Sequence, residues 1–208
     1  MTRHRNPAAK HDEAAEGKPA SLIFRIIGGE FRGRKLVYLG DARTRPMKDR
    51  VREAVFNLVS THAKGKRAID LFAGTGALGL EAISRGAASA TFIEQHFPTA
   101  RAIRQNAALL GIADRCEVNS ANVFFWAQGD LPTGPEPWLV FCSPPYAFYV
   151  ERQPETMALI TRMWQAAPAG SMFVVESDNR FDMKLLDTLS EWDVREYPPA
   201  IVAVSHKA

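Results

Sequence analysis

The sequence predicts an α/β fold in which a mostly parallel sheet is covered by helices on both faces. From Lys66 onward, short apolar runs alternate with longer amphipathic stretches, which is the pattern of successive βα units. A glycine-rich turn follows the first run, as expected where a strand passes tightly into a helix. The chain has 208 residues, of which 46% are hydrophobic, so we expect one domain with one sizeable core.

Five apolar runs are the predicted parallel strands, and helices lie between them. The strands are 68–72, 90–94, 116–119, 139–142 and 172–176, and the helices are 77–85, 98–110, 121–128, 155–167 and 181–189. Segments 192–197 and 201–205, joined by Pro198-Pro199, predict a closing antiparallel hairpin. The expected sheet therefore has seven strands.

The chain divides into three predicted segments. Residues 1–22 mix charges with Pro, Ala and Gly and lack the continuous apolar run of a secretory signal, so they predict a flexible charged tail. Residues 23–40 contain two β-prone runs separated by Gly28-Gly29 and predict a small basic β-hairpin. Residues 41–208 form the main domain, whose first helix is expected to begin near Thr44-Arg45-Pro46 and to end near His62.

Composition argues against membrane insertion and against a metal site. The longest apolar runs, 138–142 and 172–175, fall far short of the roughly 20 residues of a membrane helix. Cys116 and Cys142 lack paired spacing and the histidines are scattered, so we expect no metal. Unpaired cysteines fit a reducing, cytoplasmic setting.

Basic residues are concentrated near the start of the chain. Between Arg25 and Arg52 there are nine basic and three acidic residues, a net charge of +6, which leaves −3 for the rest of a total of +3. Such a surface can neutralise RNA phosphates. An ordinary solvated face, with arginines paired to neighbouring carboxylates, is the equal alternative. The candidate RNA-binding residues are Arg32, Arg34, Lys35 and Arg50.

The turn after the first strand indicates a ligand site. Asp70-Leu-Phe-Ala-Gly74-Thr-Gly76-Ala-Leu-Gly79 contains the pattern GxGxxG, and Glu94 ends the second strand, where a carboxylate can hold a ribose diol. Folds that bind dinucleotides share this pattern. Asp70 distinguishes them, because a carboxylate repels a pyrophosphate and favours a cationic ligand such as S-adenosylmethionine. A nicotinamide enzyme and a packed turn without a ligand are the alternatives.

Ser143-Pro144-Pro145-Tyr146 directly follows the strand 139–142, at the end where open α/β sheets bind ligands. The prolines restrict the backbone, so that the Ser143 hydroxyl and the Pro144 carbonyl can accept from one amino group. Tyr146 offers a face on which a base can stack. Two acceptors favour a more tetrahedral exocyclic amine, whose lone pair can attack a sulfonium methyl group. The alternative is a structural turn beside a core tyrosine.

Together these motifs resemble the amino-methyltransferases with an [NDS]-P-P-[YFW] signature, and the amino-terminal stretch resembles the RsmD family of ribosomal RNA methyltransferases. That stretch reads Arg25-Ile-Ile-Gly-Gly, then Arg32-Gly-Arg-Lys-Leu, Thr44-Arg-Pro and Asp49-Arg-Val-Arg-Glu. The resemblance covers Arg25 to the carboxyl terminus. It implies a Rossmann-like class I methyltransferase domain over 41–208 and methylation of a guanine N2 amine in 16S ribosomal RNA of the small ribosomal subunit.

The resemblance also implies roles for individual residues. Four catalytic residues would hold the guanine amine: Ser143, Pro144, Pro145 and Tyr146. The cofactor, S-adenosylmethionine, would contact Asp70, Phe72, Gly74, Gly76, Glu94, Asn119 and Asn122.

The sequence departs from the family pattern at two positions. Ser143 stands where an acidic or amide residue is usual, and Pro46-Met47 where Pro-Thr is common. Because serine is a weaker acceptor than aspartate, two alternatives stay open. One is an adenine-N6 methyltransferase of nucleic acids, although we find no separate target-recognition domain. The other is a non-catalytic RNA-binding or assembly protein that keeps the cofactor fold.

Overall fold

The computed structural model describes residues 24–38 and 47–208. The tail predicted over 1–22, the helix start predicted at 44–46 and the outermost residues of the predicted hairpin lie outside these ranges. Within the described residues, no helix combines the length and the apolar character needed to cross a membrane.

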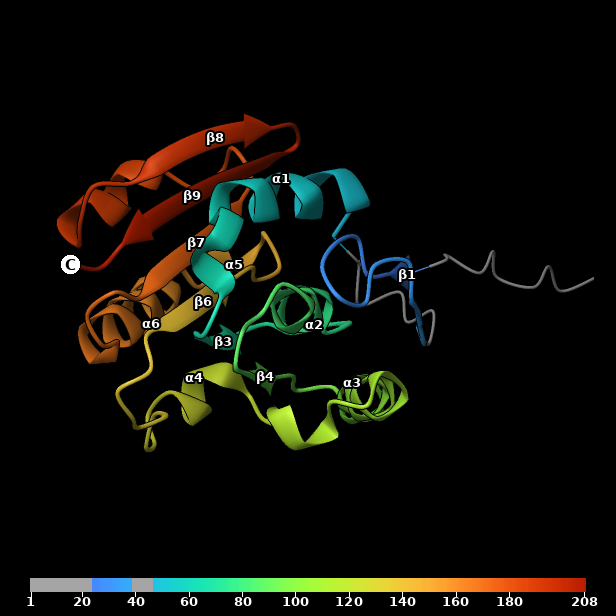
Figure 1. Cartoon of the computed structure of the whole chain (residues 1–208). Coiled ribbons are helices and arrows are strands. Elements are labelled where there is room, and N and C mark those ends of the chain that lie inside the picture. Colours follow the sequence, from blue (N-terminus) through green and yellow to red (C-terminus); the bar gives the residue numbers. More distant parts are fainter. Residues whose placement is uncertain (1–23, 39–46) are drawn as a thin grey trace, which may run out of the picture.

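A seven-stranded sheet forms the centre of the molecule (Figure 1). Its order is β5-β4-β3-β6-β7-β9-β8; the first five pair in parallel, and β9 runs antiparallel to both β7 and β8. The strands are β3 (Arg67–Asp70), β4 (Ser89–Ile93), β5 (Cys116–Asn119), β6 (Trp138–Cys142), β7 (Met172–Ser177), β8 (Asp193–Tyr197) and β9 (Ala200–His206). The predicted mostly parallel sheet with a closing hairpin is confirmed.

The central strands are buried on both faces. In β6, Leu139 and Phe141 pack into one hydrophobic layer, and Val140 and Cys142 into the other. This is why the strand reads as a continuous apolar run in the sequence. Figure 1 shows α1 (Asp49–Val59), α2 (Ala77–Ser84) and α3 (Phe97–Leu110) on one side of the sheet, and α4 (Val123–Trp126) and α6 (Gln153–Ala166) on the other.

Two predicted helices differ from expectation in length or type. The segment 181–189 forms a 3-10 helix over Met183–Thr188. The Asp182 carboxylate accepts the Lys184 N–H at its start (3.0 Å), and the Trp192 indole N–H donates to the Leu186 carbonyl (3.0 Å). The helix predicted over 121–128 is limited to the single turn of α4, which the Asn122 side chain caps through the Phe124 N–H (2.9 Å). Further 3-10 turns lie at Ser60–Ala63 and Ala113–Arg115, and α5 covers Phe148–Glu151.

The predicted amino-terminal hairpin is present, with strands of two residues each. β1 (Phe24–Arg25) pairs antiparallel with β2 (Lys35–Leu36). Gly29 lies between them with a φ of 75°, and a Cβ there would stand 1.9 Å from the Ser84 carbonyl oxygen. Only glycine allows the turn to approach α2 this closely.

One buried carboxylate holds the hairpin on α2. Glu81 is fully buried and accepts the backbone N–H groups of Ile27 and Gly28 (2.7 Å each) and the Nε–H of Arg85 (2.8 Å). Arg52 of α1 is also fully buried. Its Nε lies 4.0 Å from Glu81 Oε2, the oxygen that accepts the Ile27 N–H. Glu81 therefore connects the hairpin, α1 and α2 through one charged group.

We expect Glu81→Ala to lower the free energy of unfolding by about 3–5 kcal/mol, because it leaves Arg52 buried without this charge partner. Denaturant titration followed by circular dichroism measures the loss. Glu155→Ala, which removes an exposed ion pair with Arg152, is the control and should cost less than about 1 kcal/mol. Equal stability of the two variants would refute the anchoring role of Glu81.

Candidate active site

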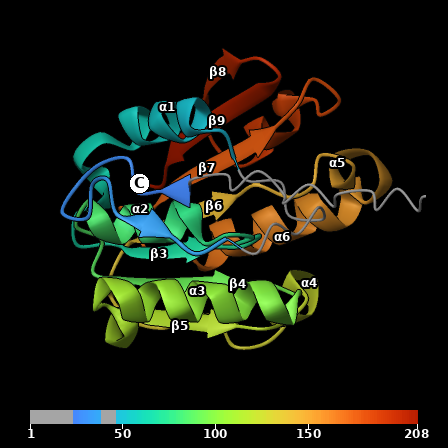
Figure 2. The same cartoon turned by 90° about the vertical axis from the view of Figure 1, so that its right-hand side faces the viewer.

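The carboxyl ends of the central strands surround a cavity of about 720 Å³. Sequence order diverges at this point: β3 leads outward to β4 and β5, whereas β6 leads to β7 on the other side. Open α/β sheets bind ligands at such a switch point. In Figure 2 the strand arrows point toward this edge, where α5 also lies. The cavity lining includes Asp70 to Thr75, Glu94, Asn122, Phe124, Ser143 to Tyr146, Phe148 and Glu176.

Asp70 is the buried acid of the glycine loop. Its side chain is almost completely shielded, and Oδ2 accepts a long hydrogen bond from the Gly79 N–H (3.3 Å). Among the described residues, Oδ1 has no hydrogen-bond partner. Desolvation by burial, with a smaller contribution from the charge of Glu94, raises the pKa of Asp70 to about 7. A buried carboxylate oxygen without a partner is costly, and Asp70 is one of the residues that line the cavity.

Glu94 holds the glycine loop in place from the end of β4. Its Oε2 accepts the Gly74 N–H (2.8 Å) and its Oε1 accepts the His96 N–H (2.7 Å). Gly74 and Gly76 have φ values of 50° and 76°, so the loop uses the left-handed backbone that the glycines permit. Gly76 caps α2 and packs toward Ile103; it supports the cavity wall without being part of the lining.

Aromatic side chains close the cavity beside α4 and α5. Phe72, Phe124 and Phe148 have ring centroids 6.1 Å apart in each pair, and the Arg152 guanidinium lies 4.2 Å from the centre of the Phe124 ring. Phe72 meets each of the other two rings edge to face, and Phe124 and Phe148 are tilted relative to each other. These contacts keep the rings in a defined arrangement. The aromatic run of α4 thus contributes one ring, that of Phe124, to the cavity lining.

The two predicted asparagines occupy different places. Asn122 lines the cavity, with its side-chain oxygen capping α4. Asn119 lies at the end of β5, where its Nδ2 donates to Glu117 (3.0 Å) and its carbonyl accepts from the Glu94 N–H (3.0 Å). Asn119 is outside the lining and positions Glu94 through the backbone.

The turn after β6 meets an acid that sequence reasoning missed. Glu176 in β7 accepts the hydroxyls of both Ser143, through Oε2, and Tyr146, through Oε1 at 2.5 Å. Burial raises the pKa of Glu176, and the two hydroxyl donors oppose that rise. The available signal was a glutamate ending the apolar run 172–176, directly beside the strand that carries the Ser-Pro-Pro-Tyr turn.

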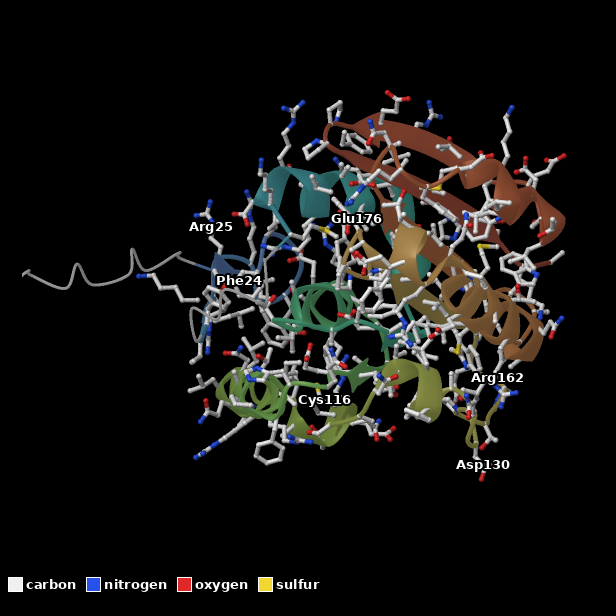
Figure 3. All side chains as sticks on the ribbon, turned by 180° about the vertical axis from the view of Figure 1, so that it is seen from behind. Phe24, Arg25, Cys116, Asp130, Arg162 and Glu176 are labelled. Carbon is white, nitrogen blue, oxygen red and sulfur yellow. The ribbon has the colours of Figure 1, made fainter. Side chains whose placement is uncertain are left out.

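The four candidate RNA-binding residues are all exposed. Within the described part of the chain, Arg32, Arg34, Lys35 and Arg50 form no ion pair; Arg34 donates weakly to the Leu109 carbonyl (3.3 Å). The pairing with acids occurs instead at Arg52, and at Arg25, 3.8 Å from Asp49. Figure 3 shows Arg25 on the hairpin side of the molecule.

A second hollow, of about 940 Å³, is more open and lies at the amino ends of the strands, where Arg67 begins β3. Asp130 and Arg162 line it, at the far side from Arg25 in Figure 3. Arg162 donates to the backbone carbonyls of Ala127 and Gly129, so its charge serves to fix the loop after α4. Across the described residues, no three His, Cys, Asp or Glu side chains are grouped as metal ligands would be.

Comparison with known proteins gives consistent matches over this fold. The family model described as "Conserved hypothetical protein 95" matches residues 24–204. Ribosomal RNA small subunit methyltransferase D of Escherichia coli is 43% identical over 122 residues, which are 59% of this chain and 60% of that protein. The match thus spans less than two thirds of that relative's length.

Two further similarities extend over more of the chain. The putative rRNA methyltransferase YlbH of Bacillus subtilis is 31% identical over 163 residues, covering 76% of this chain and 85% of that protein. The solved structure of the putative methyltransferase yhhF from Escherichia coli superposes with a TM-score of 0.71 at 30% identity, over 89% of this chain and 98% of that one. The chain therefore belongs to the family of that matching model, the RsmD family that its motifs resemble.

Proposed function

We propose that the protein transfers a methyl group from S-adenosylmethionine to the exocyclic N2 amine of a guanine in 16S ribosomal RNA. One observation carries this proposal: a single cavity is lined by Asp70, whose buried Oδ1 has no hydrogen-bond partner among the described residues, and by the Ser143–Tyr146 turn at the end of the neighbouring strand β6. The names of the RsmD relatives support the choice of substrate.

The cavity fits S-adenosylmethionine in size and in chemistry. Its volume of about 720 Å³ lies within the roughly 300–1,000 Å³ typical of small-molecule sites. Asp70 Oδ1 lacks a donor, and the cofactor's ammonium group is a donor with the complementary charge. Glu94 would hold the ribose hydroxyls. The part of the cavity wall formed by Phe72, Phe124 and Asn122 would surround the adenine. When bound, the cofactor supplies an electrophilic methyl group on a cationic sulfonium.

The Ser143–Tyr146 turn would position the amine for attack. The Ser143 hydroxyl and the Pro144 carbonyl accept its two N–H bonds, and Tyr146 stacks on the base. Transfer forms a nitrogen–methyl bond, breaks the methyl–sulfur bond and releases one proton from nitrogen to water. Because a paired guanine buries its N2 amine, the base must leave its stack to reach the turn. Catalysis then depends mainly on orientation and preorganised dipoles.

The exposed basic residues supply the proposed RNA contact. Arg32, Arg34 and Lys35 are exposed on the hairpin and Arg50 is exposed on α1, so they can bind phosphates of an RNA large enough to extend beyond the cavity. The proposed partner is the small ribosomal subunit, which places the protein in the cytoplasm. A paired-strand substrate without a flipped base would not reach the turn.

The test is transfer of labelled methyl from S-adenosylmethionine to small ribosomal subunits from a strain that lacks the enzyme, with nucleosides identified by mass spectrometry. N2-methylguanosine is the expected product. N6-methyladenosine would instead identify the adenine enzyme, which uses the same acceptor chemistry. Cofactor binding without any transfer would favour the non-catalytic RNA-binding protein, and binding of NAD alone would favour the nicotinamide enzyme.

Asp70→Asn should have opposite effects on two quantities: it should raise the free energy of unfolding of the cofactor-free protein and weaken the binding of the cofactor. Because the folded-state pKa of about 7 exceeds the ordinary 3.8, ionisation of Asp70 lowers the free energy of unfolding as pH rises from about 4 through 7. The cofactor-free variant should therefore be more stable than wild type at pH 8, by at most about 4 kcal/mol at ~1.4 kcal/mol per pKa unit. This difference should vanish toward pH 4.

The same variant should bind S-adenosylmethionine at least about tenfold more weakly, since a charge-assisted hydrogen bond is lost. Thermal unfolding across pH and titration calorimetry measure the two effects. An affinity equal to that of wild type would show that Asp70 does not face the cofactor.

Tyr146→Ala should abolish methylation and leave cofactor affinity within about twofold of wild type, because Tyr146 is assigned to the base and the cofactor lies toward Asp70. Single-turnover transfer and binding of S-adenosylhomocysteine are the measurements. Retained turnover would remove Tyr146 from the proposed base site.

The double variant Arg32→Ala/Lys35→Ala should weaken binding to ribosomal RNA. The slope of log affinity against log salt should fall by about 0.7–0.9 for each phosphate that the variant no longer neutralises. Filter binding at several salt concentrations gives the slope. Arg195→Ala on β8, where Arg195 pairs with Asp193 (2.7 Å), is the matched control and should keep the wild-type slope. A similar change in both proteins would mean that the basic hairpin has no specific part in RNA binding.

A further inference from the structure

Glu176 contacts both polar side chains of the proposed catalytic turn. Only 8% of the residue is exposed, and the part that remains accessible faces the cavity. One carboxylate oxygen accepts the Ser143 hydroxyl, and the other accepts the Tyr146 hydroxyl at 2.5 Å. Figure 3 shows Glu176 near the centre of the molecule, well away from the surface residue Asp130.

Strand register fixes this arrangement. Cys142 of β6 pairs with Val175 of β7, so Ser143 and Glu176 are the next residues on adjacent parallel strands. The Glu176 backbone is held as well, because its carbonyl accepts the buried Tyr149 hydroxyl (3.0 Å). The Glu176 backbone is therefore held by a strand pairing and by a buried hydroxyl, and the Glu176 carboxylate in turn accepts the Ser143 hydroxyl.

The direction of the Ser143 hydroxyl decides what the turn can do. A hydroxyl carries one proton and two acceptor lone pairs. With its proton donated to Glu176, the Ser143 oxygen can act only as an acceptor toward the cavity, which is what an incoming N–H bond requires. A Ser143 proton that pointed into the cavity would oppose the amine hydrogens.

The same carboxylate orients Tyr146. Its hydroxyl donates to Glu176, so the ring edge is fixed at one end and its face is held at a constant angle to the turn. Two hydroxyl donors also favour the ionised carboxylate, because hydrogen bonds to the charged form oppose the desolvation that raises the pKa of Glu176.

We propose that Glu176 is the positioning residue of the reaction: it makes Ser143 an obligate acceptor, fixes Tyr146, and supplies from β7 the negative charge that an acid at position 143 would otherwise supply. This inference rests on the proposed methyltransferase function. It accounts for how serine can stand where a stronger acceptor is usual, since hydrogen bonds to a charged partner strengthen the dipole of the hydroxyl.

Glu176→Gln tests the assignment with almost no change in volume. An amide has one acceptor and one donor end, so only one of the two hydroxyls can keep its bond. We expect kcat to fall about 10- to 100-fold, the range for loss of a charge-assisted hydrogen bond. The KM for S-adenosylmethionine and the affinity for S-adenosylhomocysteine should stay within about twofold of wild type.

Asp178→Asn is the matched control. Asp178 lies two residues further along, outside the cavity lining, and pairs with Arg180 (2.8 Å). The Asp178→Asn substitution also changes an acid to an amide near the end of β7, and this variant should keep the wild-type kcat. Thermal unfolding of both variants checks that they remain folded.

Two combinations distinguish positioning from a general structural effect. Ser143→Ala should lower the kcat of the wild-type protein. It should cause little further loss of kcat in Glu176→Gln, because both substitutions remove the same Ser143–Glu176 interaction. Ser143→Asp combined with Glu176→Gln should recover kcat relative to Glu176→Gln alone, since it returns a carboxylate to the turn.

Wild-type kcat in Glu176→Gln, or full additivity with Ser143→Ala, would overturn the assignment while leaving the methyltransferase function intact. Absence of transfer by the wild type would instead overturn the proposed function itself. All assays use the full chain with small ribosomal subunits as the methyl acceptor.

Discussion

The parallel register of β3, β4, β6 and β7 is the constraint on which the site depends. Asp70 pairs with Phe141 across β3 and β6, and Cys142 pairs with Val175 across β6 and β7. Because parallel strands in register end at one edge of the sheet, residues more than a hundred positions apart arrive around one cavity. A shift of one residue in either pairing would turn a carboxylate from the cavity into the opposite packing layer.

Three buried carboxyl groups of this fold, those of Glu81, Glu176 and Asp70, differ in their hydrogen-bond partners. The difference distinguishes the carboxyl group that stabilises the fold from the two that line the candidate site. Glu81 has three donors and holds the hairpin to α2. Glu176 is satisfied by two hydroxyls that belong to the candidate catalytic turn. Asp70 keeps one oxygen without a donor among the described residues. Such an oxygen contributes nothing to the stability of the fold, and it is the basis for the proposal that Asp70 faces a cationic ligand.

The hairpin and α1, which carry the proposed RNA-binding residues, are held to the same framework. Glu81 and Arg52 fix the hairpin backbone, and the hairpin's arginines and lysine project outward from it. The basic residues of this region differ in exposure. Arg52 is buried beside Glu81, whereas Arg32 and Lys35 are exposed and form part of the proposed RNA contact. In Figure 2 the hairpin lies on the side of the sheet that carries α1, α2 and α3.

The sequence alone determined the sheet, the longer helices and most of the candidate cavity lining, because apolar periodicity, the glycine loop and the Ser-Pro-Pro-Tyr turn are local signals. It also located Asp70, Glu94 and Asn122 at strand ends and helix starts. Tertiary structure decided what depends on neighbouring strands: Glu176 beside Ser143, Phe124 and Phe148 on the cavity wall, and Asn119 outside it. Sequence periodicity also did not distinguish the 3-10 helix at Met183–Thr188 from an α-helix. Strand pairing and side-chain hydrogen bonds bring together residues that are distant in the sequence. No local sequence pattern predicts which of these residues will be in contact.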